Sequence, residues 1–568
     1  MEKKMTTFRE LQYERPDVKQ LKKDIAGYLR QFNSAKTFVE ADSAFLGLMS
    51  LIESCFTQRT IASIRNTMNM KDEFYDQEIK FFNKETAKLM LTLKKGIKAF
   101  LTSPFRPQFE EKYGSHLFKQ CETEINMVNL LTILPTIKEG NLSTEYSKTA
   151  ATCSVEFMGE KCNFYGLLRH MQSTDREERR AAFEEWAKLY EGISGKLDEI
   201  YGKLVRTRCT IAKRLGFSSY IDYIYPSRGR YDYGAEKVAE FREAVRTYIT
   251  PFCDEMFKEQ AERLGLEKLE WYDEGLCFPE GNALPIGTPE ELTEKALDMY
   301  KEMSPETGEY FSFMREHELY DFVTRENKHL GGYMTFLPDY KAPFIFSNFN
   351  GTSADIDVLT HEAGHAFEGY YASRRLPIQL LTTSTSEINE IHSMSMEYFT
   401  YPYMERFFGD KTDKYRYAHF VDSVESIPYL VSVDEFQHRV FENPDYTSAD
   451  WRRVWREIEK KYMPWRSYGG NEFLEGGGFW MQKQHIFLYP FYYVDYAMAQ
   501  LDAFAFYKKM VEGGDAWADY LKLCSMGGKY GYFETLERAG LPNPLDPENV
   551  KELAAFVRKQ EKVLKEKI

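Results

Sequence analysis

The chain has 568 residues, enough for a large core that is normally divided into more than one domain or lobe. With 43% hydrophobic and 29% charged residues it has the composition of a globular protein, and no apolar run approaches the 18 residues that a membrane-spanning helix needs. A formal net charge of −14 argues against nucleic acid as a partner.

The start of the chain and its cysteines predict a cytoplasmic location. Residues 1–6 lead into charged sequence without the apolar segment of a secretion signal. The 8 cysteines are scattered and none forms a C-x-x-C pair, which is typical of thiols that stay reduced. We therefore expect no membrane and no nucleic-acid partner, and the sequence leaves the oligomeric state open.

Amphipathic helices fill the first 140 residues, for example over 17–32 and 73–101. A β-hairpin is predicted over 153–165. Thr174 and Glu177 then fit a capping box at the start of a long helix. The apolar residues of that helix recur at helical spacing: Phe183, Trp186, Tyr190, Ile193, Leu197, Ile200 and Leu204.

A soft domain boundary is expected near 170–190, between a helical region over 1–180 and a second, mostly helical region over 181–568. A short β-like island lies within the second region, with candidate strands over 332–336 and 343–349. The island would either hold an extended peptide along an edge strand or only pack against the next helix. The predicted fold class is mainly α with this small β element.

The most informative motif is His361-Glu362-Ala363-Gly364-His365. Residues four apart lie on one face of a helix, so both imidazoles can bind one zinc ion while Glu362 acts as general base on a metal-bound water. With 10 histidines in the chain, chance predicts only about 0.03 such patterns. Gly364 costs helix stability, so we expect another backbone to pack close to it.

A third protein ligand must follow, and the metzincin pattern is excluded because Glu368 and Tyr371 stand where it requires Gly and His. A carboxylate from the next helix is the alternative. Ser384 and Glu387 fit a capping box there, which makes Glu390 the first free carboxylate inside the helix. We therefore predict Glu390 as the third ligand.

Several neighbours are candidates for supporting roles around these ligands. Glu397 lies two turns after Glu390 and either orients a ligand or is a solvated charge. His392 is expected to be a packed or exposed histidine rather than a fourth ligand, since a fourth protein ligand would leave no place for water. Thr352 and Asp355 are expected to cap the metal helix. Alternatively, Asp355 or Asp357 would brace a ligand imidazole.

Downstream, the glycines at 476–478 favour a mobile loop that would close on substrate. His485 and an aromatic run over 491–496 follow directly. A peptidase develops negative charge on the attacked carbonyl oxygen, and a phenol or imidazole donor beside the metal would stabilise it. An aromatic stripe that only packs the core is the alternative reading.

At these residues the chain resembles the thimet oligopeptidase and oligoendopeptidase F family of zinc metallopeptidases, in which 24 residues separate H-E-x-x-H from the ligand Glu. His365 to Glu390 has this spacing. The resemblance also includes residues 331–335, 343–352, 485–487 and 490–493, and it is closest to the oligoendopeptidase F branch.

The resemblance implies one zinc ion and a helical N-terminal region that covers a deep substrate channel. It also implies oxyanion donors from a His and two Tyr three residues apart. Tyr493 and Tyr496 match that spacing, but their separation from His485 is about one residue shorter than in thimet oligopeptidase. Tyr492 therefore remains a rival to Tyr493.

The predicted function is a zinc-dependent oligoendopeptidase that cleaves internal bonds of short peptides. His361, His365 and Glu390 would bind zinc and Glu362 would move the proton. One alternative is a zinc carboxypeptidase of similar helical fold, which needs a cationic pocket for the terminal carboxylate. The other is a non-catalytic peptide-binding zincin, against which the presence of Glu362 argues.

Overall fold

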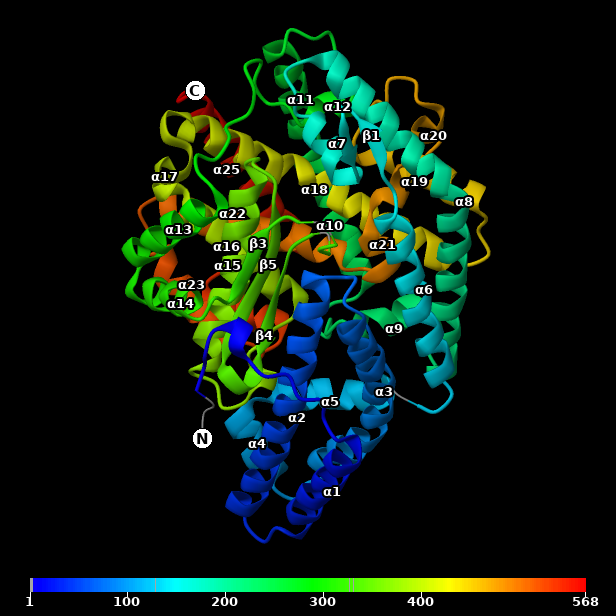
Figure 1. The fold of residues 1–568 in the computed structure, drawn as a ribbon, viewed down its shortest axis with the longest axis vertical. Coiled ribbons are helices and arrows are strands. Elements are labelled where there is room, and N and C mark those ends of the chain that lie inside the picture. Colours follow the sequence, from blue (N-terminus) through cyan, green and yellow to red (C-terminus); the bar gives the residue numbers. More distant parts are fainter. Residues whose placement is uncertain (1–3, 128, 326, 330) are drawn as a thin grey trace. The chain divides into compact units, whose positions relative to one another are not determined.

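The computed structural model describes residues 4–127, 129–325, 327–329 and 331–568 (Figure 1). The fold is mainly α, as predicted, and the β-structure of the described residues is limited to two small sheets. The chain forms two compact units, each built from three separate stretches. The first unit contains Met1–Leu130, Pro285–Phe407 and Lys509–Leu541, and the second contains Leu131–Leu284, Phe408–Lys508 and Pro542–Ile568.

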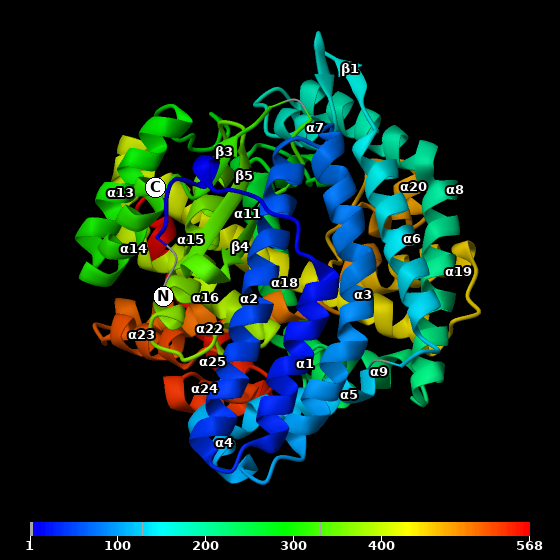
Figure 2. The same ribbon diagram turned by 60° about the horizontal axis from the view of Figure 1, so that its bottom comes forward.

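The first unit begins with long helices that pack side by side, α1 (Val18–Ser34), α2 (Phe38–Met68) and α3 (Glu73–Leu101) (Figure 2). The Asp17 carboxylate caps α1 by accepting two backbone N–H groups. The helices predicted over 17–32 and 73–101 are thus confirmed. The other helices of this unit are α4 (Arg106–Tyr113), α5 (Ser115–Met127), α13 (Pro289–Met303), α14 (Pro305–Glu316), α15 (Ala354–Ser373), α16 (Ser386–Phe399), α17 (Glu405–Phe408), α23 (Ala516–Met526) and α24 (Tyr532–Ala539).

A three-stranded sheet of the first unit supports α15. Its central strand β5 (Ala342–Phe349) is almost entirely buried, and it pairs in parallel with β3 (Tyr320–Val323) and antiparallel with β4 (Tyr333–Leu337). β4 is therefore an edge strand of this sheet. The two predicted strands are confirmed as β4 and β5, while the four-residue β3 was not predicted.

The second unit is built around the 40-residue helix α8 (Arg176–Leu215). The β1–β2 hairpin, β1 (Val155–Phe157) and β2 (Glu160–Cys162), contacts α8 and α7 (Phe164–His170) (Figure 2). Its remaining helices are α6 (Ile133–Ala151), α9 (Tyr220–Ser227), α10 (Ala235–Tyr248), α11 (Thr250–Arg263), α12 (Trp271–Glu274), α18 (Thr412–Glu442), α19 (Ser448–Tyr462), α20 (Glu472–Glu475), α21 (Gln484–Leu488), α22 (Tyr493–Val511), whose last turn belongs to the first unit, and α25 (Pro547–Lys565).

Short 3-10 helices occur in both units: η1 (Phe8–Glu10), η2 (Pro338–Tyr340), η3 (Gln379–Leu381), η4 (Tyr401–Tyr403), η5 (Gly409–Lys411) and η6 (Gly478–Gln482). Within the described ranges, no helix is both long and apolar enough to cross a lipid bilayer. The compact units do not follow the predicted division at residue 180, which lies inside α8. That division stays a prediction.

Two local predictions in the second unit are wrong. α8 is capped by Asp175, whose carboxylate accepts from the backbone N–H of Glu177, and not by a box between Thr174 and Glu177. The glycine run over 476–478 is not an open loop, because it joins α20 to η6 and the following side chains are buried. A Cβ on Gly477 would lie 2.0 Å from the carbonyl oxygen of Arg452, so glycine there allows two backbones to touch.

Candidate metal centre and its surroundings

Three predicted ligands meet in the first unit. His361 and His365 extend from one face of α15, and Glu390 extends from α16. Oε2 of Glu390 lies 3.3 Å from Nε2 of His361 and 3.4 Å from Nε2 of His365. Ligands at about 2.0 to 2.1 Å from a tetrahedral zinc ion are about 3.3 Å apart, so the donor set fits this metal.

A glycine allows the two ligand-bearing helices to pack closely. A Cβ on Gly364 would lie 2.6 Å from the carbonyl oxygen of His392 and 2.7 Å from Cα of Ser393. Both contacts are with the backbone of α16, which cannot rotate away as a side chain can. The expected close approach of a second backbone at Gly364 is therefore confirmed, and it brings Glu390 within reach of both imidazoles.

Two further side chains hold the ligands. Nδ1 of His361 lies 2.7 Å from Oε1 of Glu397, which leaves Nε2 directed at the candidate metal position. The Ser393 hydroxyl donates to Oε2 of Glu390 at 3.0 Å. Glu397 thus lies against His361 rather than in solvent, whereas Ser393 carried no sequence signal.

The electrostatics of the three ligands favour a bound cation. Burial opposes a charged His361, but Glu390 and Glu397 outweigh it and raise the pKa of His361 well above its ordinary value. Burial likewise opposes a charged Glu390, yet the two imidazoles lower the pKa of Glu390 well below its usual range. The negative charge of the Glu390 carboxylate is therefore held next to the two imidazoles. A cation bound there would displace the protons that the imidazoles share with this carboxylate.

Replacing Glu397 by Gln preserves the shape of the side chain but removes the charge beside Nδ1 of His361. We expect zinc affinity to fall about 10- to 100-fold, measured by competition with a chromogenic chelator, because outer carboxylates orient a ligand histidine and raise its basicity. Glu405→Gln, a change at an exposed position of the same unit, serves as the control. Equal affinity in the two variants would show that Glu397 does not support His361.

Glu362 lies on α15 beside His361 and is 8% exposed. Burial raises the pKa of Glu362. The imidazoles of His361 and His365 and the backbone N–H of Met334 act in the opposite direction but do not outweigh burial. Gly332 is adjacent, since a Cβ there would lie 3.6 Å from Oε1 of Glu362. The carboxylate therefore lies between the ligand helix and β4, the edge strand.

Two predictions in this unit are wrong. Asp355 neither caps α15 nor braces an imidazole; its carboxylate accepts the backbone N–H groups of Asn350 and Gly351, each at 2.8 Å, and so fixes the turn before α15. The expected box between Ser384 and Glu387 does not form, because α16 begins at Ser386. The Asn389 side chain instead pairs with the backbone of Ser384.

Of two other predicted neighbours of the site, Thr352 differs from expectation and His392 agrees with it. Thr352 does not cap α15, because the N-cap is Ser353. The Thr352 hydroxyl instead donates to the side-chain oxygen of Asn350. His392 is 1% exposed and lies outside the group of three ligands, as expected of a packed histidine. Burial lowers the pKa of His392 to about 3, so its imidazole is neutral.

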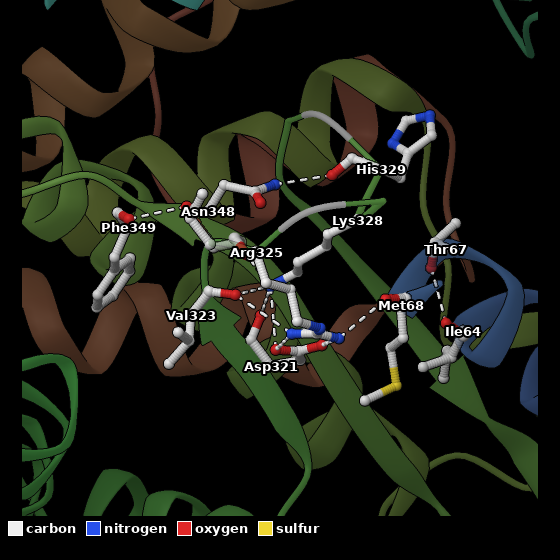
Figure 3. A network of polar contacts seen from close by, with 12 residues as sticks. Ile64, Thr67, Met68, Asp321, Val323, Arg325, Lys328, His329, Asn348 and Phe349 are labelled. Carbon is white, nitrogen blue, oxygen red and sulfur yellow. Dashed lines mark hydrogen bonds and ion pairs between the residues drawn. The ribbon is translucent and has the colours of Figure 1, made fainter. Parts of the chain in front are cut away.

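A buried lysine anchors the segment between β3 and β4 (Figure 3). The Lys328 ammonium donates to the Asp321 carboxylate and to the carbonyl oxygens of Asp321, Val323 and Ser347, at 2.5 to 3.0 Å. Arg325 pairs with the same carboxylate and donates to the carbonyl oxygen of Met68 on α2. This network ties Arg325 and Lys328 to α2, β3 and β5. On β4, the Met334 N–H contacts the Glu362 carboxylate.

In the second unit, the predicted donors form one aromatic cluster. The ring centroid of His485 lies 4.7 Å from that of Tyr493 and 6.0 Å from those of Tyr492 and Tyr496. The Lys483 ammonium lies 4.9 Å from the ring centroid of Tyr493. The structure thus brings His485 together with all three candidate tyrosines.

Arginines hold the backbone that carries this cluster. Arg208 donates to the carbonyl oxygens of Ile486 and Phe487. Arg230 donates to the carbonyl oxygen of Phe491 and, together with Arg228, pairs with the buried carboxylate of Asp495.

The arginines act on a strained position, since Phe491 has φ of +63°, which is unusual for a bulky residue. Its N–H donates to the side chain of Gln437 at 2.9 Å. These positioning residues carry no sequence signal, because they lie far from the cluster along the chain and follow no motif.

The Arg228 guanidinium lies 4.6 Å from the ring centroid of Tyr492 and is 14% exposed. If the cluster donates to a substrate carbonyl, Arg228→Met should lower kcat about tenfold with little change in KM, because a positioned donor is worth more in the transition state than in the ground state. The same loss should vanish in a Tyr492→Phe background, because Arg228 stacks on the ring of Tyr492. Arg246→Met, at an exposed arginine of α10, is the control. Additive losses would assign Arg228 a purely structural role.

The comparisons with known proteins place this architecture in a family. Residues 8–128 match the Peptidase M3 N-terminal domain, and residues 169–275 and 297–554 match Peptidase family M3. The chain belongs to peptidase family M3.

Individual relatives agree with that assignment. A solved structure described as PZ peptidase A with inhibitor 2 is 41% identical, with a TM-score of 0.95 over 98% of this chain and 99% of that one. An oligoendopeptidase F homolog of Mycoplasma genitalium is 22% identical over 65% of this chain, and the match spans 63% of that protein's length. The structure of oligoendopeptidase-F from Enterococcus faecium, 17% identical, shares the fold with a TM-score of 0.61 over 97% of this chain and 98% of that one.

Proposed function

We propose that this protein is a zinc-dependent oligoendopeptidase that cleaves internal bonds of short peptides. The observation that carries the proposal is the convergence of His361, His365 and Glu390 at spacings that suit one zinc ion, with Glu362 next to the first ligand. Membership of peptidase family M3 supports it. A zinc ion held there would supply Lewis acidity to water and to the scissile carbonyl.

Glu362 has the position of a general base and acid. Its carboxylate takes a proton from the attacking water and then delivers it to the amine that leaves. Burial raises the pKa of Glu362, which makes the carboxylate a better proton acceptor than an exposed glutamate. The contact with the Met334 N–H keeps the carboxylate beside the edge strand while the proton is transferred.

β4 is proposed to hold the substrate. An edge strand can pair with an extended peptide through main-chain hydrogen bonds, which grip the peptide without reading much of its sequence. The Lys328 ammonium ties the chain before β4 to β3 and β5, the other two strands of the same sheet. We also propose, on the resemblance, that the helical region over 1–180 limits the length of accepted peptides.

The cluster in the second unit is proposed to supply donors to the carbonyl oxygen of the substrate. Tyr493 and Tyr496 have the spacing that the resemblance implies, and His485 packs against both rings. A phenol or imidazole donor would stabilise the negative charge that develops on this oxygen. Tyr492 packs against Tyr496 with a centroid separation of 5.1 Å and stays the rival to Tyr493.

The test uses an internally quenched peptide blocked at both ends, with cleavage sites read by mass spectrometry. We expect internal cleavage that stops on chelation and returns when zinc is added. Trimming of a free C-terminus, with the blocked peptide untouched, would establish the carboxypeptidase instead. Binding without cleavage of either peptide, in the zinc-loaded protein, would establish the non-catalytic zincin.

A further inference from the structure

A second group of metal-ligand residues lies in the second unit, outside the M3 zinc motif. Glu160 and Cys162 belong to β2, and His170 is the last residue of α7. One donor atom from each side chain lies within 4.8 Å of the others. In the described residues, only this group and the His361 set have such an arrangement.

The orientation of His170 matches that of a ligand histidine. Its Nδ1 lies 2.6 Å from Oε1 of Glu178, and the Ser173 hydroxyl donates to the other oxygen of that carboxylate. Nε2 of His170 is buried without a hydrogen-bond partner in the described structure. A buried ring nitrogen without a partner is costly, and a metal ion would satisfy it. His361 shows the same pairing of Nδ1 with a glutamate.

Cys162 supplies a soft donor at the same place. It is 3% exposed, and its Sγ packs 3.2 Å from the position that a Cβ on Gly166 would take. Glu160 is exposed and pairs with Arg169. An exposed ion pair contributes little free energy, so the Glu160 carboxylate can leave Arg169 and bind a cation instead. A thiolate with an imidazole and a carboxylate favours zinc over magnesium or calcium.

We propose that Cys162, His170 and Glu160 bind a second divalent cation of the zinc type. Binding replaces the thiol proton of Cys162, which passes to solvent, by a bond from the sulfur to the metal. The fourth position is open to water. Because a hairpin with strands of three residues is marginal by itself, the cation would fasten β2 to the end of α7.

Cobalt substitution distinguishes this site from the M3 site. Only a thiolate ligand gives the intense near-ultraviolet sulfur-to-cobalt band, and no cysteine belongs to the group of His361, His365 and Glu390. We expect two cobalt ions in the wild type and one, with the band retained, in His365→Ala. Cys162→Ser should bind one ion and lose the band. The readout is independent of peptidase activity, so the proposed function and this site can fail separately.

Matched variants test the assignment. Cys153→Ser, at a buried cysteine just before the β1–β2 hairpin, should keep the band. Glu178→Gln should weaken cobalt binding at this site about 10- to 100-fold, as expected for a carboxylate that orients a ligand histidine. No thiolate band in the folded wild type, or a band that survives Cys162→Ser, would overturn the proposal.

Discussion

Glu362→Gln is expected to lower kcat about 10²- to 10⁴-fold while zinc stays bound, because glutamine keeps the shape of the side chain but cannot accept the proton. The chain offers a matched control on the same helix. Glu368 is 5% exposed and lies outside the group of three ligands, and burial raises its pKa well above the ordinary value. Because glutamine keeps the size of this side chain, Glu368→Gln should leave hydrolysis of the blocked peptide nearly unchanged.

Zinc content measured on the same samples separates proton transfer from metal loss. A Glu362→Gln protein with full zinc and wild-type kcat would contradict the role assigned to this carboxylate. A protein that lost both zinc and activity would instead place Glu362 among the groups that hold the metal. The expected result is full zinc with little turnover.

Gly364→Ala is expected to destabilise the protein by about 1 to 3 kcal/mol and to weaken zinc binding, because the new Cβ would overlap the backbone of α16. The new Cβ would lie 2.6 Å from the carbonyl oxygen of His392, which is two residues after Glu390. Separation of α15 from α16 moves the carboxylate ligand away from both imidazoles. Thermal unfolding with and without zinc, and competition with a chelator, measure the two effects.

The control is Gly195→Ala on α8, where nothing beyond the adjoining residues and backbone of the helix itself lies within 4 Å of the position of the new Cβ. There the substitution gains helix propensity without a clash, so we expect a small increase in stability. If Gly364→Ala bound zinc as tightly as the wild type, the close approach of the two helices would not be what places Glu390.

The sequence was more informative about which residues meet at the candidate metal centre than about their surroundings. His361 and His365 could be paired because a helix has a fixed period, and Glu390 could be reached because it lies on the next helix. By contrast, Arg208 and Arg230 contact backbone carbonyls more than 250 residues away in the chain. No local pattern encodes such a contact, because its partners are brought together only by the tertiary fold.

The errors in capping have a similar cause. Ser384 and Glu387 satisfy the pattern of a capping box, but α16 begins two residues later and Asn389 takes over the backbone of Ser384. The glycines over 476–478 suggested freedom of the backbone, whereas Gly477 is needed for a close contact with Arg452. A sequence shows which conformations glycine permits but not which neighbour makes use of them.

The division of each unit into three stretches affects the order in which the chain can fold during synthesis. α15 packs against α23, and the Tyr520 hydroxyl of α23 donates to the carbonyl oxygen of His392 at 2.9 Å. Ribosomes release the chain from its N-terminus, so α15 and α16 emerge long before α23 exists. The apolar faces that α23 covers therefore stay exposed to solvent until α23 has been synthesised. A chain truncated after α22 would keep these faces exposed and would aggregate rather than form a smaller peptidase.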